Sequence, residues 1–360
     1  MNFYHGAIPG SRRGFNHGTP SSRDVGGNSN ADGSGKTHRG KLVKLDKEHL
    51  SFFKAQGYLI LNQVLDLELC AWARDRLWST LPQSSRIKRD DRSTHIGPFD
   101  LSDINEDVQE LRSGYRWQLR KAGTESNMVR LVFSETLQAI AQQLLGSDTL
   151  IEPVINGSTM GRQGAAWPEG PVDPALGNEG ARGIYATLPY KHKDRLPEQC
   201  HTDGHPFQLG LVGLIDDVLP AGGGFKVWPG SHSRLYPTFI MQYDQPRIPY
   251  YDHLPTYKGI LHTPEYLEIL EAISKDTPSV DCYGRAGDIV LWHHRLAHMA
   301  GHNYSDQIRH AILYDFSTNN LDQNRLDPPQ NNMWRDWSHE LQESSLTYSP
   351  EFAKSQHLIP

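Results

Sequence analysis

The chain has 360 residues, a formal net charge of −6 and a sequence pI near 6.3. This length can bury one large core, and the slight acidity argues against a nucleic-acid partner, whose phosphates attract clustered Lys and Arg. No apolar run approaches the roughly 18 residues of a membrane span, and the N-terminus has no apolar signal core. We therefore expect a soluble, cytoplasmic protein without a membrane partner.

The first part of the chain differs in composition from the rest. Residues 1–40 are rich in Gly, Ser, Asn and Arg and show no apolar periodicity. Such a segment cannot bury enough apolar surface to offset the entropy of ordering, so a disordered or loosely ordered arm is expected. Residues 41–360 are expected to form a single domain with helical additions and lid-like loops.

Three helices are predicted from N-capping residues that are followed by apolar side chains at helical spacing, and a fourth is predicted as an insertion between strands. The first follows Asp46 and ends at Gly57, because a residue without a Cβ favours helix termination. The others are expected after Asp66, after Ser134 and over 264–275.

Short apolar segments separated by Gly- and Pro-rich turns dominate the chain from residue 150 onward. Many short strands with such turns are typical of a jelly roll, so the sequence predicts a mainly β fold with flanking helices. Two long connections, 82–120 and 161–183, are either lids over an active-site mouth or surface insertions. The predicted strands are 58–61, 150–155, 184–189, 208–215, 225–228, 288–292 and 308–316.

A His-x-Asp motif immediately before one predicted strand is the first candidate for chemistry. Side chains two positions apart on an extended segment face the same way, so His201 and Asp203 can point into a barrel together. With a distant His they supply two imidazoles and one carboxylate, a set that holds ferrous iron on one face and leaves positions open. A second His-x-Asp, His192 and Asp194, lies in a charged run typical of an exposed loop, and we favour the first.

The third ligand of such a set is not decided by chemistry, because five histidines in the C-terminal part of the chain could supply it. The competing histidines are His293, His294, His298, His302 and His310.

An arginine near the start of the last predicted strand, Arg309, has a planar fork that binds carboxylates through two parallel hydrogen bonds. Strand alternation places it on one face with Ala311 and Leu313, pointing inward. The alternative is a surface salt bridge.

The cysteines indicate a reducing compartment. Cys70, Cys200 and Cys282 include no CxxC pair and leave an odd number, which argues against disulfides and structural zinc. Cys200 precedes His201 and is either a thiol close to a metal or a small buried residue on a strand. We favour the buried residue.

These motifs resemble the phytanoyl-CoA dioxygenase (PhyH-like) family of iron- and 2-oxoglutarate-dependent oxygenases. The resemblance covers roughly residues 45–316 and implies a double-stranded β-helix (a cupin-like jelly roll), Fe(II), 2-oxoglutarate and O2. It is strongest in the two metal segments, 200–204 and 291–298. It is also carried by 50–61, by 206–232 with Gly222-Gly223-Gly224 and Pro229-Gly230-Ser231-His232, and by 287–309 with Gly287-Asp288, His298, Asn303, Ser305 and Arg309.

The resemblance also implies the roles of individual residues. His201, Asp203 and His298 would be the catalytic metal ligands, His298 because of its spacing to Arg309, which would bind the distal carboxylate of 2-oxoglutarate. Related halogenases have Ala or Gly at the position of Asp203, so a carboxylate there favours hydroxylation or another oxidation. Family members often carry a hydroxyl residue two places after the distal His, whereas this chain has Ala300. The co-substrate therefore lacks its usual second anchor at that position.

The sequence thus predicts a dioxygenase that oxidises an unactivated C–H bond of a small-molecule metabolite and releases succinate and CO2. Three alternatives remain: an iron oxygenase that does not use 2-oxoglutarate, an inactive cupin-like binding or scaffold protein, and a zinc hydrolase. Zinc would give no reason for Arg309 at its offset from the triad. The oligomeric state is left open.

Overall fold

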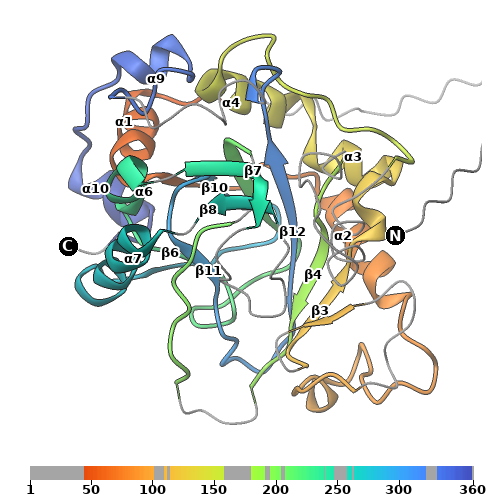
Figure 1. Ribbon diagram of the computed structural model, residues 1–360. Helices are drawn as coiled ribbons and strands as arrows, with labels where there is room; N and C mark the ends of the chain where they lie inside the picture. The colour runs from red at the N-terminus through yellow and green to blue at the C-terminus, as the bar shows by residue number, and fades with distance from the viewer. Residues whose placement is uncertain are drawn as a thin grey trace, which may run out of the picture. The chain divides into compact units, whose positions relative to one another are not determined.

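The elements of the protein are drawn in Figure 1, a computed structural model. The predicted N-terminal arm and the competing motif at His192 and Asp194 lie outside the residues that the structure describes. The described residues are 44–100, 109–111, 114–157, 180–190, 195–203, 207–238, 240–246, 258–261, 263–321 and 331–358.

A seven-stranded antiparallel sheet lies at the centre of the fold, with the strand order β1-β10-β5-β12-β4-β3-β2. Strands far apart in sequence are therefore neighbours, with the last strand, β12, between β5 and β4. The strands are β1 (Tyr58–Leu61), β2 (Gln109–Leu111), β3 (Arg116–Leu119), β4 (Gly183–Thr187), β5 (Leu209–Leu214), β10 (Ile289–His293) and β12 (Arg309–Phe316).

A smaller sheet has the order β11-β6-β9, and two further strands, β7 and β8, form a separate pair. Phe225 of the smaller sheet packs against Trp292 of the large sheet with ring centroids 4.8 Å apart, so the two sheets share an interior. These two packed antiparallel sheets with flanking helices confirm the predicted fold class, a double-stranded β-helix. The strands are β6 (Phe225–Val227), β7 (Ile240–Pro246), β8 (Lys258–Leu261), β9 (Val280–Cys282) and β11 (His298–Ala300).

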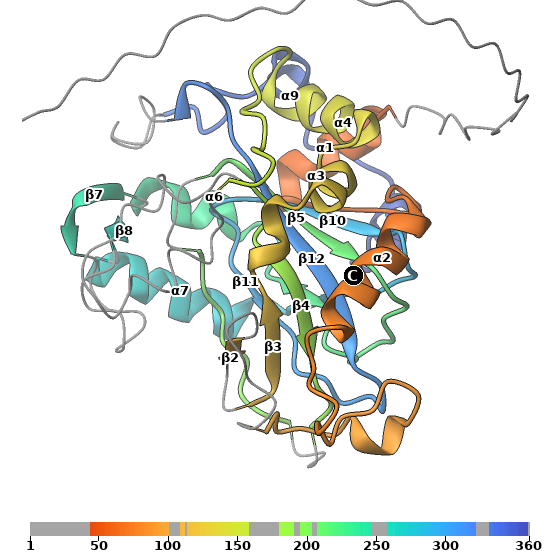
Figure 2. The same ribbon diagram turned by 90° about the vertical axis from the view of Figure 1, so that its right-hand side faces the viewer.

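Helices cover the outside of this β structure. Figure 2 shows α2 and α3 beside the large sheet and α7 on the opposite side, near β11. Within the described parts of the chain, we find no helix with the length and apolar character needed to cross a bilayer. The helices are α1 (Lys47–Gln56), α2 (Leu67–Trp78), α3 (Ser126–Val132), α4 (Glu135–Leu145), α6 (Ser231–Leu235), α7 (Pro264–Asp276), α9 (His339–Glu343) and α10 (Pro350–Ser355), with 3-10 turns at Arg92–Thr94, Lys121–Thr124 and Tyr236–Thr238.

The predicted helix boundaries are confirmed by their capping bonds. The side chain of Asp46 accepts from the backbone N–H of His49 at 3.0 Å, and Gly57 ends α1 with a φ of 81°. Asp66 and Ser134 cap α2 and α4 through the same kind of bond. Local sequence was sufficient here, because a cap involves residues only two or three positions apart.

Two sequence-based expectations about strands were wrong. Residues 150–155 do not form a strand; Leu150 makes only an isolated bridge to Thr318, and Pro153 has no N–H to donate to a ladder. Conversely, β3 lies in the stretch 82–120, which was expected to be irregular. In β3, polar Arg116 and Gln118 alternate with apolar residues, and the structure turns this polar face toward the interior.

The two faces of β12 have different neighbours, and this positions the candidate site. His310 lies near Trp78 of α2, with ring centroids 5.8 Å apart, so the even-numbered side chains face the helices. Arg309 is on the opposite face and reaches the backbone of Gly223, beside the smaller sheet. Alternation along the strand therefore gives β12 an inner face of Arg309, Ala311, Leu313 and Asp315.

Candidate metal centre

A short backbone pairing brings the His-x-Asp segment to the distal histidine. The N–H of His201 donates to the carbonyl of His298 at 3.1 Å, and the N–H of His298 donates back to His201 at 2.7 Å. His298 is itself the first residue of β11 and pairs with Val227 of β6. Two residues almost a hundred positions apart are thus opposite each other, with their imidazole centroids 4.9 Å apart.

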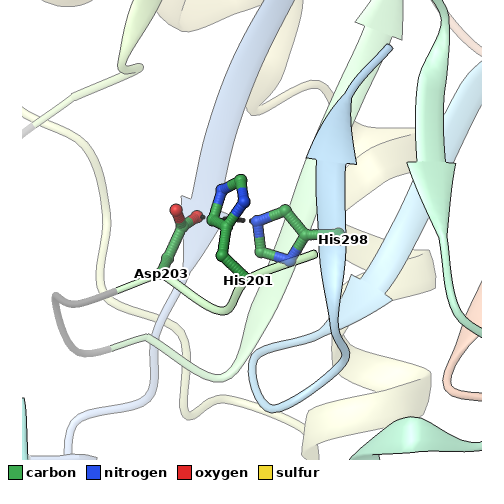
Figure 3. Close-up of side chains that lie close together, drawn as sticks. All are labelled: His201, Asp203 and His298. Carbon is green, nitrogen blue, oxygen red and sulfur yellow. Dashed lines mark ion pairs between the residues drawn. The ribbon is translucent and has the colours of Figure 1, made fainter. Parts of the chain in front are cut away.

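Asp203 completes the cluster because the segment after His201 is extended. Thr202 faces the other way and hydrogen-bonds to the hydroxyl of Tyr266 on α7, which leaves Asp203 on the side of His201. One potential ligand atom from each of His201, Asp203 and His298 lies within 4.8 Å of the others. Figure 3 shows these three side chains converging from two segments of the chain.

The hydrogen bonds of the two imidazoles determine which nitrogen faces the cluster. Nδ1 of His201 lies 2.7 Å from the carbonyl of Gln199, and Nδ1 of His298 lies 2.8 Å from the carbonyl of Leu296. A carbonyl only accepts, so each Nδ1 carries the proton and each Nε2 is the unprotonated nitrogen of its ring. Such backbone support is what metal-ligating histidines usually have. The residues present therefore fit a divalent transition metal.

Arg182, which the sequence analysis did not identify, contacts the carboxylate of the cluster. Its Nη1 donates to Oδ2 of Asp203 at 2.8 Å, and its Nε lies 3.7 Å from Oδ2 of Asp315. Burial alone would lower the pKa of Arg182, but the two carboxylates raise it well above its usual value. The guanidinium stays charged and holds Asp203 in one orientation. Sequence gave no signal for this role, since Arg182 lies outside every motif.

The cluster is shielded from solvent. His201, Asp203 and His298 are 7 %, 9 % and 3 % exposed. The ring of His298 lies 5.2 Å from that of Phe225 and 5.7 Å from that of Trp292, centroid to centroid. An apolar wall limits water on this side and strengthens electrostatic interactions within the cluster.

The competing histidines lie elsewhere in the packing. They are absent from the three-residue cluster, which is the one potential metal-binding group found among the described residues. His293 stacks on Trp337 at 4.9 Å, His294 contacts Phe207, His302 contacts Tyr190 and His310 contacts Trp78.

Arg309 lies on the interior face of β12, at the end of the strand that reaches Gly223. It is 2 % exposed, and its Nε donates to the carbonyl of Gly223 at 2.6 Å, so a surface salt bridge does not describe its position. Asp281 is an electrostatic neighbour: burial raises the pKa of Asp281, while Ala221 N–H, Lys226 and Arg309 act in the opposite direction. A buried guanidinium at this place can bind a further anion.

Two more polar side chains of the interior face were missed by the sequence analysis. Gln118 on β3 is fully buried, and neither its amide N nor its amide O has a hydrogen-bond partner among the described residues. Thr187 on β4 is 6 % exposed, and its hydroxyl likewise has no partner in that part of the chain. Strand alternation was the only available signal, and β3 was not predicted as a strand.

Cys200 has the character of a packing residue. It packs against a small apolar cluster that includes Trp228 and Tyr266. Burial, with a contribution from Glu198, raises the pKa of its thiol to about 12, so it is a poor source of thiolate near neutral pH. Cys200 is half-buried and lies outside the described strands, so it packs as a small residue but is not the buried strand residue that the sequence suggested.

Comparisons with solved structures give distant likenesses. The carbocyclase SnoK from nogalamycin biosynthesis is 19 % identical over 81 % of this chain and 95 % of its own, with a TM-score of 0.42. EctD from S. alaskensis, with bound Fe, is 15 % identical over 85 % and 87 %, with a TM-score of 0.44. EvdO2 from Micromonospora carbonacea var. aurantiaca, with 2-oxoglutarate, is 18 % identical over 77 % and 92 %, with a TM-score of 0.41.

The family comparison is stronger. No curated protein matches the chain significantly. The family described as phytanoyl-CoA dioxygenase (PhyH), in contrast, matches residues 53–311, well over half of the chain. The chain therefore belongs to the phytanoyl-CoA dioxygenase family, which confirms the predicted enzyme class, an Fe(II)- and 2-oxoglutarate-dependent dioxygenase.

Proposed function

We propose that His201, Asp203 and His298 hold Fe(II) and that Arg309 binds the distal carboxylate of 2-oxoglutarate. The observation that supports this most directly is the convergence of two Nε2 lone pairs and one carboxylate at a buried place. Two nitrogens and one oxygen on one face suit ferrous iron with open positions. When bound, the iron and co-substrate supply activation of O2 for C–H oxidation, with release of succinate and CO2.

The protein's own residues position and shield these groups. Arg182 holds Asp203 through the bond at Oδ2, and the carbonyls of Gln199 and Leu296 hold the imidazoles. Phe225 and Trp292 exclude water beside His298. These contacts orient the ligands before any substrate arrives, which lowers the cost of assembling the site.

Register supports the placement of the co-substrate. His298 is opposite Val227 and Ala300 is opposite Phe225, while Arg309 is bonded to Gly223. The metal end and the arginine end are thus four residues apart on one segment, which spans at most about 13 Å because Gly223 has a φ of 82° and the segment is not fully extended.

The substrate is proposed to be a small-molecule metabolite, oxidised by hydroxylation or desaturation in the cytoplasm. Gln118 supports a substrate or co-substrate with a polar group, because its buried amide offers both a donor and an acceptor. The arm of residues 1–40 followed by one domain, 41–360, is proposed as the domain organisation.

An anaerobic titration tests the proposal. Fe(II)-loaded protein is titrated with 2-oxoglutarate, and the visible metal-to-ligand charge-transfer band is recorded for the wild type and for Arg309→Ala. We expect a saturable band whose midpoint rises at least tenfold in the variant, as for the loss of a charged hydrogen-bonding partner. Iron binding without a band would support an oxygenase that does not use 2-oxoglutarate. Preference for zinc or no metal binding would contradict the proposal outright.

A further inference from the structure

Ala300 leaves the proposed 2-oxoglutarate site with one anchor fewer than the family usually has. A methyl group at this position cannot donate a hydrogen bond, and a dicarboxylate held by one guanidinium at its far end is left with unfilled acceptor sites. The missing donor therefore has to come from another element that lines the same end of the interior, if the carboxylate is to be fully satisfied.

Thr187 is the residue directly opposite Arg309. The register of β12 and β4 pairs these two residues, and the register of β4 and β3 pairs Thr187 with Arg116. Side chains of directly opposite residues share one face of a sheet, with Cβ atoms about 5 Å apart. A single cross-strand row thus carries Arg116, Thr187 and Arg309 on the interior face.

The surroundings of Thr187 leave its hydroxyl available. A Cβ built on Gly223 would lie 3.4 Å from Cγ2 of Thr187, so the methyl group is the part that packs against this glycine. The backbone carbonyl of Thr187 accepts from the side chain of Asn303 at 2.9 Å, which fixes the strand at this position. The hydroxyl is buried without a hydrogen-bond partner among the described residues. A buried donor in this situation is costly unless a ligand fills the place.

We propose that Thr187 donates the second hydrogen bond to the distal carboxylate of 2-oxoglutarate, in place of the hydroxyl that Ala300 lacks. The inference rests on the proposed function, and it assigns the co-substrate anchor to β4 instead of β11. Arg309 supplies the charge, and Thr187, one strand away on the same face, supplies the neutral donor. The site thereby gains selectivity for a 2-oxo acid with a second carboxylate.

The test compares two ligands that differ only at the distal end. 2-Oxoglutarate and 2-oxobutyrate, which lacks the distal carboxylate, are each titrated into Fe(II)-loaded protein without oxygen, with the charge-transfer band and calorimetry as readouts. We expect Thr187→Val to weaken the binding of 2-oxoglutarate about tenfold or more and the binding of 2-oxobutyrate less than about twofold. Thr187→Ser, which keeps the hydroxyl, should remain within about threefold of the wild type.

Two further variants separate a specific contact from a general disturbance. Ala300→Ser added to Thr187→Val restores a hydroxyl at the family's position and should recover part of the lost affinity. Ser317→Ala is the matched control, because Ser317 also has a buried hydroxyl without a partner in the described chain but lies beyond the far end of β12. It should leave both affinities unchanged.

The outcomes distinguish this inference from the proposed function. The proposed function stands if the wild type binds 2-oxoglutarate and Arg309→Ala weakens that binding. If Thr187→Val then leaves the affinities for both ligands unchanged, or lowers both equally, only the role of Thr187 is overturned. If the wild type shows no saturable binding of 2-oxoglutarate, both proposals fail. Thermal melting of Thr187→Val provides the folding control, and we expect it to be no less stable than the wild type.

Discussion

Arg182 and Asp203 form a buried ion pair in which the same carboxylate oxygen faces both the guanidinium and the candidate metal position. Oδ2 of Asp203 lies 2.8 Å from Nη1 of Arg182 and 3.5 Å from Nε2 of His298. The carboxylate is therefore held by a positive charge even without metal. A divalent cation at the cluster would bind Asp203 together with Arg182. It would supply part of the positive charge that Arg182 provides in the metal-free protein.

This sharing predicts the behaviour of Arg182→Met. Loss of the guanidinium removes a cation that lies beside the buried carboxylates of Asp203 and Asp315, which should lower the free energy of unfolding of the metal-free protein by about 3 kcal/mol. Fe(II) then replaces the missing charge, so the metal-induced rise in Tm should be larger in the variant than in the wild type. Thermal melting with and without Fe(II) measures both.

Arg234→Met is the matched control for that experiment. Arg234 pairs with Asp276 through two bonds, but both side chains are largely exposed, and such pairs contribute little to stability. We expect a small change in Tm and no change in the effect of Fe(II). An equal metal-induced rise in Tm for Arg182→Met and the wild type would contradict the shared-carboxylate interpretation.

Replacement of each proposed iron ligand by Ala should abolish stoichiometric iron binding. Loss of residues that only support metal ligands typically costs ten- to a hundredfold in affinity, and loss of a ligand itself should exceed about a hundredfold. His201→Ala, Asp203→Ala and His298→Ala should each lose 2-oxoglutarate turnover to succinate. Iron content after anaerobic loading and succinate formation are the measurements. His302→Gln, outside the cluster, should retain both, and full iron content in His298→Ala would shift the assignment to another histidine.

Gln118→Leu should stabilise the protein. The buried amide of Gln118 has no hydrogen-bond partner among the described residues, and replacing such a group with an apolar one of similar size gains about 1 kcal/mol or more. Chemical denaturation measures the change. Gln143→Leu is the control, because the amide of Gln143 bonds to both backbone groups of Leu45 and its loss should destabilise the fold. A lower stability of Gln118→Leu would show that its amide is satisfied after all.

The protein should become less stable as the pH decreases from 6.5 to 4, because His232 titrates differently in the folded and unfolded chain. Burial lowers the pKa of His232 from 6.5 to about 4, partly offset by its bond to the carbonyl of Lys54. Between pH 6.5 and 4, His232 is protonated in the unfolded chain but neutral in the folded protein. The free energy of unfolding therefore decreases as the pH falls through this range. The full loss from this group is about 3 kcal/mol. Burial also lowers the pKa of neighbouring His293, which acts in the same direction.

Denaturation midpoints at pH 7.5 and 4.5 test this dependence. His232→Gln should show a smaller difference between the two pH values than the wild type. His339→Gln should behave as the wild type, because the side chain of His339 is 83 % exposed. Identical pH dependence in His232→Gln and the wild type would show that another group controls the acid sensitivity.

Much of the local structure could be predicted from the sequence. Asp46, Asp66 and Ser134 identified three helix starts, because a capping bond joins residues two or three positions apart. The period of two along a strand also placed Arg309 on one face of β12 and His310 on the other. In contrast, β3 was missed because its inner face is polar, and a polar face was taken as a sign of an exposed, irregular segment.

The candidate site depended on contacts across long stretches of chain. By itself, the sequence determined that His201 and Asp203 point the same way, since that relation is set within three residues. Only the tertiary structure decided that His298 is opposite His201, that Arg182 holds Asp203 and that Thr187 is opposite Arg309. The physical reason is that strand pairing between distant segments sets these neighbours, and the pairing register is fixed by the packing of the whole fold.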